Sequence, residues 1–90
     1  MYCKGAKKGT ALFAFHPNAS VNLVMLAGDF NQWQPLTMKK QKDGSFAAVV
    51  SLPSGGCQYK FIVDGQWMVD PDNSSWAVNT YGTLNSVARL

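Results

Sequence analysis

Side chains that could carry out acid–base or nucleophilic chemistry are few in this chain. It has one histidine, His16, beside Pro17 at the end of an expected strand, and no glutamate. A nucleophile needs an orienting base, and glycoside hydrolysis needs two carboxyl groups across a cleft. Asp29, Asp64 and Asp70 stand in turn-like contexts instead. The sequence therefore predicts no catalytic residue and no enzymatic activity.

Metal and redox chemistry are equally poorly supplied. Cys3 and Cys57 lack a CxxC spacing, and with a single histidine they do not make a zinc site. We expect no metal, no cofactor, and free thiols in a reducing compartment. The chain has no stretch near the ~20 apolar residues of a membrane span and no apolar signal core after its first lysines. A cytoplasmic location without membrane contact is the expectation.

The positive charge does not indicate a nucleic-acid partner. The net charge is only +3, and 14% of the residues are charged. A protein that follows a phosphate backbone needs a long basic stripe. Most of the lysines fall instead into two separate groups, one near the start and one in a turn: Lys4, Lys7 and Lys8, and Lys39, Lys40 and Lys42.

The aromatic residues are more informative. The C–H face of a glucose unit can pack on an indole much as a nucleobase does, so exposed tryptophans bind a sugar polymer. Trp33 follows a polar pair and Trp67 follows an Asp-Gly turn, so neither stands in the alternating context of a core residue. The alternative for each is partial burial at the edge of the core. Trp76, alone in a polar segment, could be a hydrophobic plug.

The elements that must position these rings read as strands. No long segment has the 3.6-residue apolar period of a helix, and turn signals recur every 8 to 12 residues. Asp64-Gly65 before Gln66-Trp67 is a strong hairpin signal because both turn residues tolerate positive φ. Residues 53–56 (Pro-Ser-Gly-Gly) reverse the chain, and residues 70–79 read as a surface loop. The expected strands are 10–16, 21–27, 45–52, 58–63 and 87–90.

Ninety residues, 47% of them hydrophobic, are enough for one core and too few for two. Phe13, Phe15, Phe30, Phe46 and Phe61 supply its bulk. Six or so short strands predict an all-β fold, a β-sandwich of immunoglobulin-like type. We expect a flexible N-terminal segment at residues 1–9 and a single sandwich domain at residues 10–90.

A family resemblance covers nearly all of that domain. Four strings carry it in order: Gly28-Asp29-Phe30-Asn31-Gln32-Trp33, then residues 58–67 (QYKFIVDGQW), then Asp70-Pro71, and finally residues 79–87 (NTYGTLNSV). They closely resemble family 48 carbohydrate-binding modules, which occur in kinase subunits and in amylolytic enzymes. The resemblance implies an immunoglobulin-like sandwich of the early set type.

The resemblance also implies a set of binding residues. Trp33 and Trp67 match tryptophans that stack on successive glucose units of an α-1,4 chain, and Lys60 and Asn85 match residues that bond sugar hydroxyls. Tyr81 and Thr83 match a late-loop pair in which the family commonly has leucine at the first position. From the residues alone, Lys60, Thr83 and Asn85 are unremarkable polar groups.

Three hypotheses for the function stay open. The first is a non-catalytic module that binds an α-1,4-linked glucan, such as glycogen, starch, a maltooligosaccharide or β-cyclodextrin. The second is a regulatory domain that binds a protein partner and keeps a vestigial sugar site. The third is the N-terminal module of a glucan branching or debranching enzyme, beside a neighbouring catalytic domain.

Overall fold

The computed structural model describes residues 1–52 and 55–89. Within them the chain forms ten strands and one short 3-10 helix, η1, and no α-helix. The strands, in chain order, are β1 Tyr2–Lys4, β2 Thr10–Phe15, β3 Val24–Gly28, β4 Leu36–Thr37, β5 Lys39–Lys40, β6 Phe46–Ser51, β7 Cys57–Val63, β8 Gln66–Met68, β9 Trp76–Val78 and β10 Leu84–Ala88; η1 is Asp29–Asn31.

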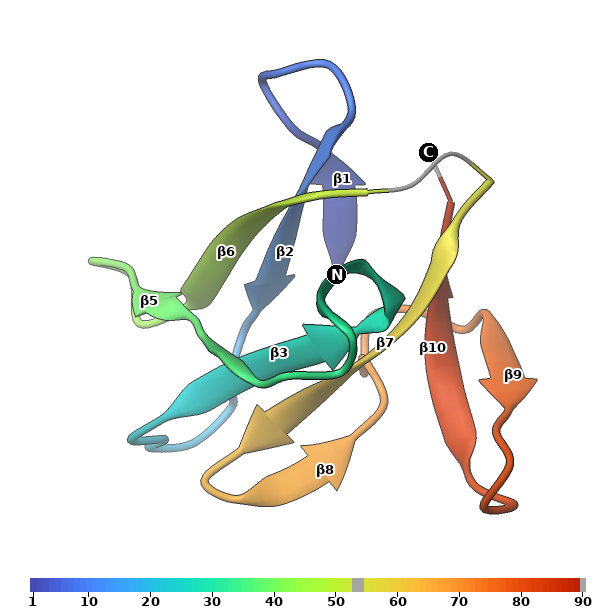
Figure 1. Ribbon diagram of the computed structural model, residues 1–90. Coiled ribbons are helices and arrows are strands. Elements are labelled where there is room, and N and C mark those ends of the chain that lie inside the picture. Colours follow the sequence, from blue (N-terminus) through green and yellow to red (C-terminus); the bar gives the residue numbers. More distant parts are fainter. Residues whose placement is uncertain (53–54, 90) are drawn as a thin grey trace.

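Two antiparallel sheets make up the molecule (Figure 1). The first has the strand order β1-β2-β6-β5. The second runs β4-β3-β7-β10-β9, and β8 pairs with β7 as a sixth strand. The expected all-β, immunoglobulin-like sandwich is confirmed, and β7 is the central strand of its larger sheet.

The core lies between the two sheets and is largely aromatic. Alternation along β7 sends Tyr59 and Phe61 inward, where both are fully buried. Tyr59 meets Phe13 of β2 edge-to-face, with ring centroids 4.7 Å apart. Four of the five phenylalanines are buried; Phe30 is half-buried and stacks on Phe13 at 5.5 Å. This packing ties the sheets together and leaves the even-numbered residues of β7 on the outer face.

Local turn chemistry is borne out where the sequence signal was strong. Asp64 and Gly65 have φ values of 48° and 87°, as a two-residue hairpin between β7 and β8 requires. Gly28 is required for a different reason, since a Cβ there would lie 2.6 Å from the carbonyl oxygen of Gln58. Gly28 lies beside the start of β7, and the Asp64-Gly65 turn follows its end.

Four strands lie where none was expected, and two of them, β4 and β5, lie between the expected strands 21–27 and 45–52. β1 pairs with β2, so part of the segment before Thr10 joins the first sheet. β9 lies inside the segment 70–79, which was expected to be a loop, and pairs with β10. The closing strand also begins earlier than expected, at Leu84. In each case pairing with an adjacent strand outweighs a polar or turn-like local sequence. The flexibility of residues 1–9 stays a prediction.

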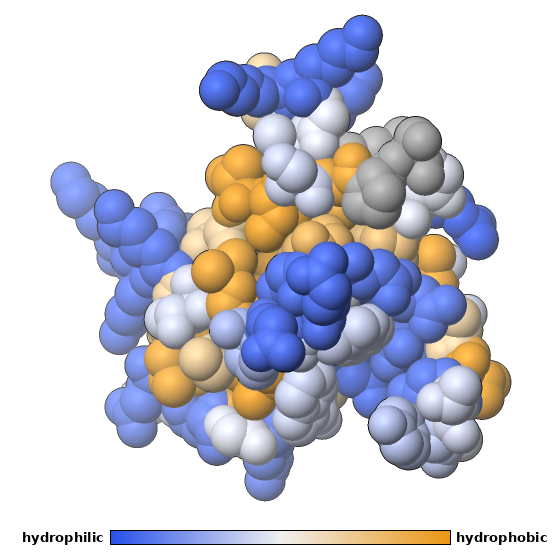
Figure 2. Space-filling view, viewed as in Figure 1, coloured by the Kyte–Doolittle hydropathy of each residue, from blue (hydrophilic) through white to orange (hydrophobic). Residues whose placement is uncertain are grey.

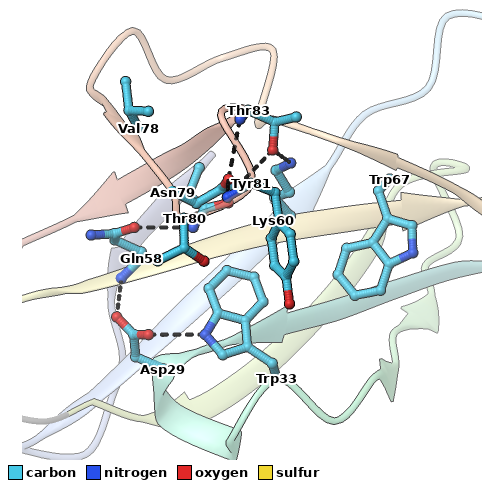
Figure 3. Close-up of a pocket in the computed structure, with 11 residues that line it drawn as sticks. Asp29, Trp33, Gln58, Lys60, Trp67, Val78, Asn79, Thr80, Tyr81 and Thr83 are labelled. Carbon is cyan, nitrogen blue, oxygen red and sulfur yellow. Dashed lines mark hydrogen bonds between the residues drawn. The ribbon is translucent and has the colours of Figure 1, made fainter.

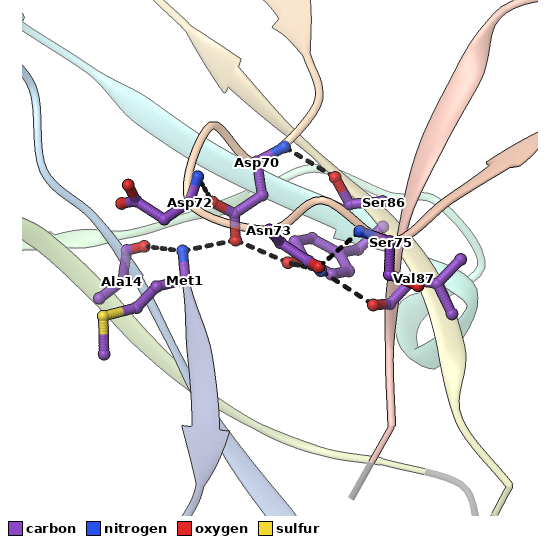
Figure 4. Close-up of polar contacts among 9 residues, drawn as sticks. Met1, Ala14, Asp70, Asp72, Asn73, Ser75, Ser86 and Val87 are labelled. Carbon is purple, nitrogen blue, oxygen red and sulfur yellow. Dashed lines mark hydrogen bonds and ion pairs between the residues drawn. The ribbon is translucent and has the colours of Figure 1, made fainter.

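Asp70 corrects another expectation. It stands before a proline as a turn residue would, yet it is buried between the sheets with 1% of its surface exposed. Its carboxylate accepts hydrogen bonds from the Tyr59 hydroxyl at 2.6 Å and from the Asp72 N–H, and it pairs with the amino group of Met1 (Figure 4). The Asp70 N–H donates to the Ser86 hydroxyl at 2.7 Å. Asp70 is therefore a structural centre that joins the Met1 amino group, β7 and β10.

The surface carries its charge on projecting segments. In Figure 2 the loop between β1 and β2 and the end of the sandwich near β5 are hydrophilic, while apolar groups lie between these segments and around a hydrophilic patch near the centre of this face. Within the described residues no helix is both long and apolar enough to cross a bilayer. Half of the expected reversal at residues 53–56 and the last residue of the expected strand 87–90 lie outside the described residues, at positions 53, 54 and 90.

Candidate functional site

A groove of about 720 Å³ lies on the outer face of the larger sheet (Figure 3). The six residues named from the sequence all line it, although they come from four separate parts of the chain. Its walls and floor are formed by Asp29, Trp33, Gln58, Lys60, Trp67, Val78, Asn79, Thr80, Tyr81, Thr83 and Asn85. The structure thus brings the whole predicted set together.

Trp33 is held by the tight turn that follows β3. Its N–H donates to the Gly28 carbonyl at 2.9 Å, and its indole Nε1–H donates to Asp29 Oδ1 at 2.9 Å. Gln32 and Trp33 both have positive φ, 54° and 60°, a conformation that residues other than glycine rarely adopt. The turn therefore holds an unfavourable backbone conformation, and in this conformation the half-buried Trp33 ring lines the groove.

Trp67 and Tyr81 are much more exposed. Trp67 lies on β8 opposite Ile62 of β7, and 51% of its surface is accessible. Tyr81 projects from the loop between β9 and β10 with 89% accessible. In the view of Figure 3 the Tyr81 ring projects between the two indoles. Three aromatic rings from three different loops or strands thus border one groove.

Polar side chains of β7 and β10 form the floor. Gln58 and Lys60 are two residues apart on β7, so both face outward beside the groove. Asn85 of β10 is 6% exposed and donates from Nδ2 to Gln58 Oε1 at 3.0 Å. Its Oδ1 accepts from Asn79 Nδ2, also at 3.0 Å. Asn85 is therefore fixed from both sides before any ligand binds.

Asn79 organises the loop that carries Tyr81. Its Oδ1 accepts the N–H groups of Tyr81 and Thr83, and its Nδ2 donates to Thr83 Oγ1 at 2.6 Å as well as to Asn85. Lys60 Nζ donates to the same Thr83 hydroxyl at 3.3 Å. The side chain of Asn79 thereby uses all of its hydrogen-bonding capacity within the protein.

The electrostatics suit an uncharged ligand. Asp29 and Lys60 are the charged side chains of the groove, and their charges are opposite. Within residues 1–52 and 55–89 no three histidine, cysteine or acidic side chains gather as a metal site would require. Cys57 is buried beside this region; burial, with a smaller effect from the Asp29 charge, raises the pKa of its thiol to about 11. The arrangement offers stacking and hydrogen bonding, and little acid–base chemistry.

The sequence did not single out five of the lining residues. Gln58 had a usable signal, because it is two residues before Lys60 on a confirmed strand and must share its face. Asp29 stood out only as a turn residue, and nothing local showed that its carboxylate meets an indole. Trp76 is 54% exposed, so it does not fill the core, and it lies outside the groove. The other lining residues missed are Val78, Asn79 and Thr80.

Comparison of the sequence with known proteins identifies the family of this chain. Residues 12–90 match the family model described as the glycogen recognition site of AMP-activated protein kinase. The chain is 39% identical over 67 residues to the AMP-activated protein kinase subunit beta-1 of Homo sapiens, and 38% identical to the beta-2 subunit of Mus musculus. The match covers 74% of this chain and 24% of each relative. For the beta-1 sequence of Sus scrofa the identity is 39% and the coverage 53% of the relative.

Solved structures show the same fold. The pullulanase of Paenibacillus barengoltzii superposes with a TM-score of 0.59 at 21% identity in its D470A mutant complexed with maltotetraose. The apo form gives 0.53 at 26% identity. In both cases the match covers 91% of this chain and 13–14% of the pullulanase chain. In the kinase subunits and in pullulanase alike, the matched region is one part of a longer chain.

Proposed function

This chain belongs to the family of the glycogen recognition site of AMP-activated protein kinase, and on that premise we propose that its groove binds an α-1,4-linked glucan. Trp33 and Trp67 are the stacking surfaces for successive glucose units. Tyr81 is a third ring, at the position where the resembling modules commonly have leucine. The family is one of binding modules, and the groove has no pair of carboxyl groups for hydrolysis.

The single observation that carries the proposal is the convergence of the six residues named from the sequence on one groove. They come from the turn after β3, from β7, β8 and β10, and from the loop before β10. Half-exposed or fully exposed rings beside polar side chains are costly to leave in water and match the alternating C–H faces and hydroxyls of a sugar. A glucan is also neutral, in keeping with the balanced charge of the groove.

The hydrogen-bond pattern predicts which way the polar contacts run. Thr83 Oγ1 already accepts from Lys60 and Asn79, so its hydroxyl proton is left to donate to a ligand. Gln58 accepts from Asn85 through Oε1, which leaves its amide N–H groups available as donors. Lys60 adds further N–H donors. The floor therefore binds the glucan mainly through the acceptor lone pairs of sugar oxygens.

The affinity should be modest. If each stacking ring contributes roughly 1 to 3 kcal/mol, then after the entropy of association a dissociation constant of about 0.1 to 1 mM is expected. Such a value suits a module that gains strength from many sites on one particle. A catalytic domain or protein partner beside the module is part of the same proposal, because the matched relatives carry this region within longer chains.

Calorimetric titration of the purified domain with maltoheptaose and β-cyclodextrin tests the proposal, and cellohexaose is the control for linkage. Saturable heat with the α-linked sugars and none with cellohexaose is the expected result. Equal heat with cellohexaose would reject the α-glucan specificity. No heat with any sugar would reject the binding function and favour a domain that binds a protein and keeps an inactive sugar site.

A further inference from the structure

Asp29 makes contacts that the binding function described above does not use. Its Oδ1 accepts the Trp33 indole N–H at 2.9 Å, and its Oδ2 accepts the Gln58 backbone N–H at 2.8 Å. The carboxylate thus bridges the turn after β3 and the start of β7 (Figure 3). One side chain joins a stacking ring to the strand that carries the polar floor.

The indole needs such an anchor because its backbone is strained. A residue other than glycine with positive φ costs about 1 kcal/mol or more, and such conformations persist where the surroundings over-determine them. The turn supplies several restraints: the Trp33 N–H bonds Gly28, and Asn31 accepts from the Gly28 N–H and donates to the Gln34 carbonyl. These fix the backbone. The bond to Asp29 is the one that fixes the ring.

The contact continues into a connected network across the groove. From Trp33 it passes through Asp29 to the backbone of Gln58, whose side chain bonds Asn85. Asn85 bonds Asn79, which bonds the hydroxyl of Thr83. The orientation of the ring is therefore set relative to the residues that would bond the sugar, and a carboxylate is a strong acceptor for this purpose.

We propose that Asp29 is a positioning residue of the groove, which orients the Trp33 indole for stacking through its N–H and registers it against β7. The inference rests on the proposed glucan-binding function. A negatively charged acceptor at the indole N–H also raises the electron density of the ring face, which favours contact with the positive edges of sugar C–H groups. Asp29 thus acts through Trp33.

The test follows the three tryptophan indole signals of the ¹⁵N-labelled domain by NMR in wild type, Asp29→Asn and Asp29→Ala. In Asp29→Ala we expect the Trp33 indole proton to move upfield and to exchange with water at least about threefold faster, because its acceptor is gone. The Trp67 and Trp76 signals should stay in place. Asp72→Asn is the matched control, since it removes an exposed carboxylate outside the groove and should leave all three signals unchanged.

Affinity for maltoheptaose supplies the second measurement. Asp29→Ala should weaken binding about 3- to 10-fold, and Asp29→Asn by a smaller factor because its amide oxygen can still accept the indole N–H. Trp33→Phe keeps a ring but has no N–H. In that background the Asp29→Ala change should cause almost no further loss, which a general structural role of Asp29 would not produce.

The outcomes separate this inference from the proposed function. An unchanged Trp33 indole signal in Asp29→Ala, or an equal loss of affinity in the Trp33→Phe background, overturns the positioning role. If wild type binds no α-glucan, the proposed function fails and with it the affinity part of the inference. The indole signal then still decides whether Asp29 orients the ring.

Discussion

Strand β7 carries two hydrogen-bond networks, one on each face of the larger sheet. On the inner face Tyr59 meets the carboxylate of Asp70, which is buried. On the outer face Gln58 meets the carboxylate of Asp29, which is exposed. Each network is built around one aspartate carboxylate and contains at least one asparagine. What differs is access to water, and this decides whether breaking a network costs stability or binding.

The inner network should tolerate substitution least. Asp70→Ala leaves the Tyr59 hydroxyl and the Asp72 N–H without their acceptor and the Met1 amino group without its ion-pair partner. Because buried donors left without an acceptor are costly, the free energy of unfolding should fall by about 2 to 4 kcal/mol. Urea denaturation measures it. Affinity of the folded fraction for maltoheptaose should stay at the wild-type value, and a parallel fall in affinity would show that the two networks are not independent.

The outer face should show the opposite pattern at Trp67. Half of its surface is exposed, so Trp67→Ala should change the free energy of unfolding by less than about 0.5 kcal/mol. Loss of a stacking ring should cost about 2 kcal/mol of binding, near thirtyfold in the dissociation constant measured by calorimetry. Trp76→Ala is the matched control, because Trp76 is 54% exposed and lies outside the groove. Equal weakening by both variants would contradict the assignment.

Two asparagines give a matched pair between the networks. Asn73 donates to the Tyr59 hydroxyl and the Val87 carbonyl on the inner side, and Asn79 holds the Tyr81 loop on the outer side. Asn73→Ala should lower the free energy of unfolding by about 1 to 2 kcal/mol with little change in affinity. Asn79→Ala should weaken glucan binding about fivefold, because the Tyr81 loop would then have to become ordered on binding, at an entropic cost. Denaturation and titration of both variants would show crossed effects; effects on the same quantity would remove the distinction.

Alkaline pH should act on the inner face with the smallest effect. Burial raises the pKa of Cys57 from 9.0 to about 11, and burial with the Asp70 hydrogen bond raises the pKa of Tyr59 as well. An unfolded chain loses these protons first, so the stability is fully present below pH 9 and is lost as pH rises toward 11. From the thiol alone we expect a loss of about 1 kcal/mol between pH 8 and pH 10. Cys57→Ala should remove that part of the pH dependence in urea denaturation, and an unchanged slope would contradict it.

Features that depend on neighbouring residues could be predicted from the sequence. The β7–β8 hairpin follows from Asp64 and Gly65, which accept positive φ, and the inward pair Tyr59 and Phe61 follows from alternation. Together with the other short strands, the hairpin and the alternation were sufficient to predict the β-sandwich. The position of Trp67 beside the groove follows from the same hairpin.

Features that depend on tertiary contacts or on strand pairing could not be predicted. β9 has three residues in a polar segment, and hairpin pairing with β10 makes it a strand. Asp70 precedes a proline as many turn residues do, and its burial depends on the Tyr59 hydroxyl and the Met1 amino group, which reach it from other parts of the chain. The link between Asp29 and Trp33 likewise needs the turn geometry around η1, which the residue types alone do not specify.

The positive φ values of Gln32 and Trp33 also bear on how this protein can change over evolution. The strained conformation of the two residues lowers the stability of the whole domain, whereas it orients only the Trp33 ring. A substitution at exposed Gln32 to a residue that accepts this conformation, such as glycine or asparagine, would return part of that energy without touching the groove. The turn is therefore a place where one substitution can recover stability lost when other residues of the binding face change.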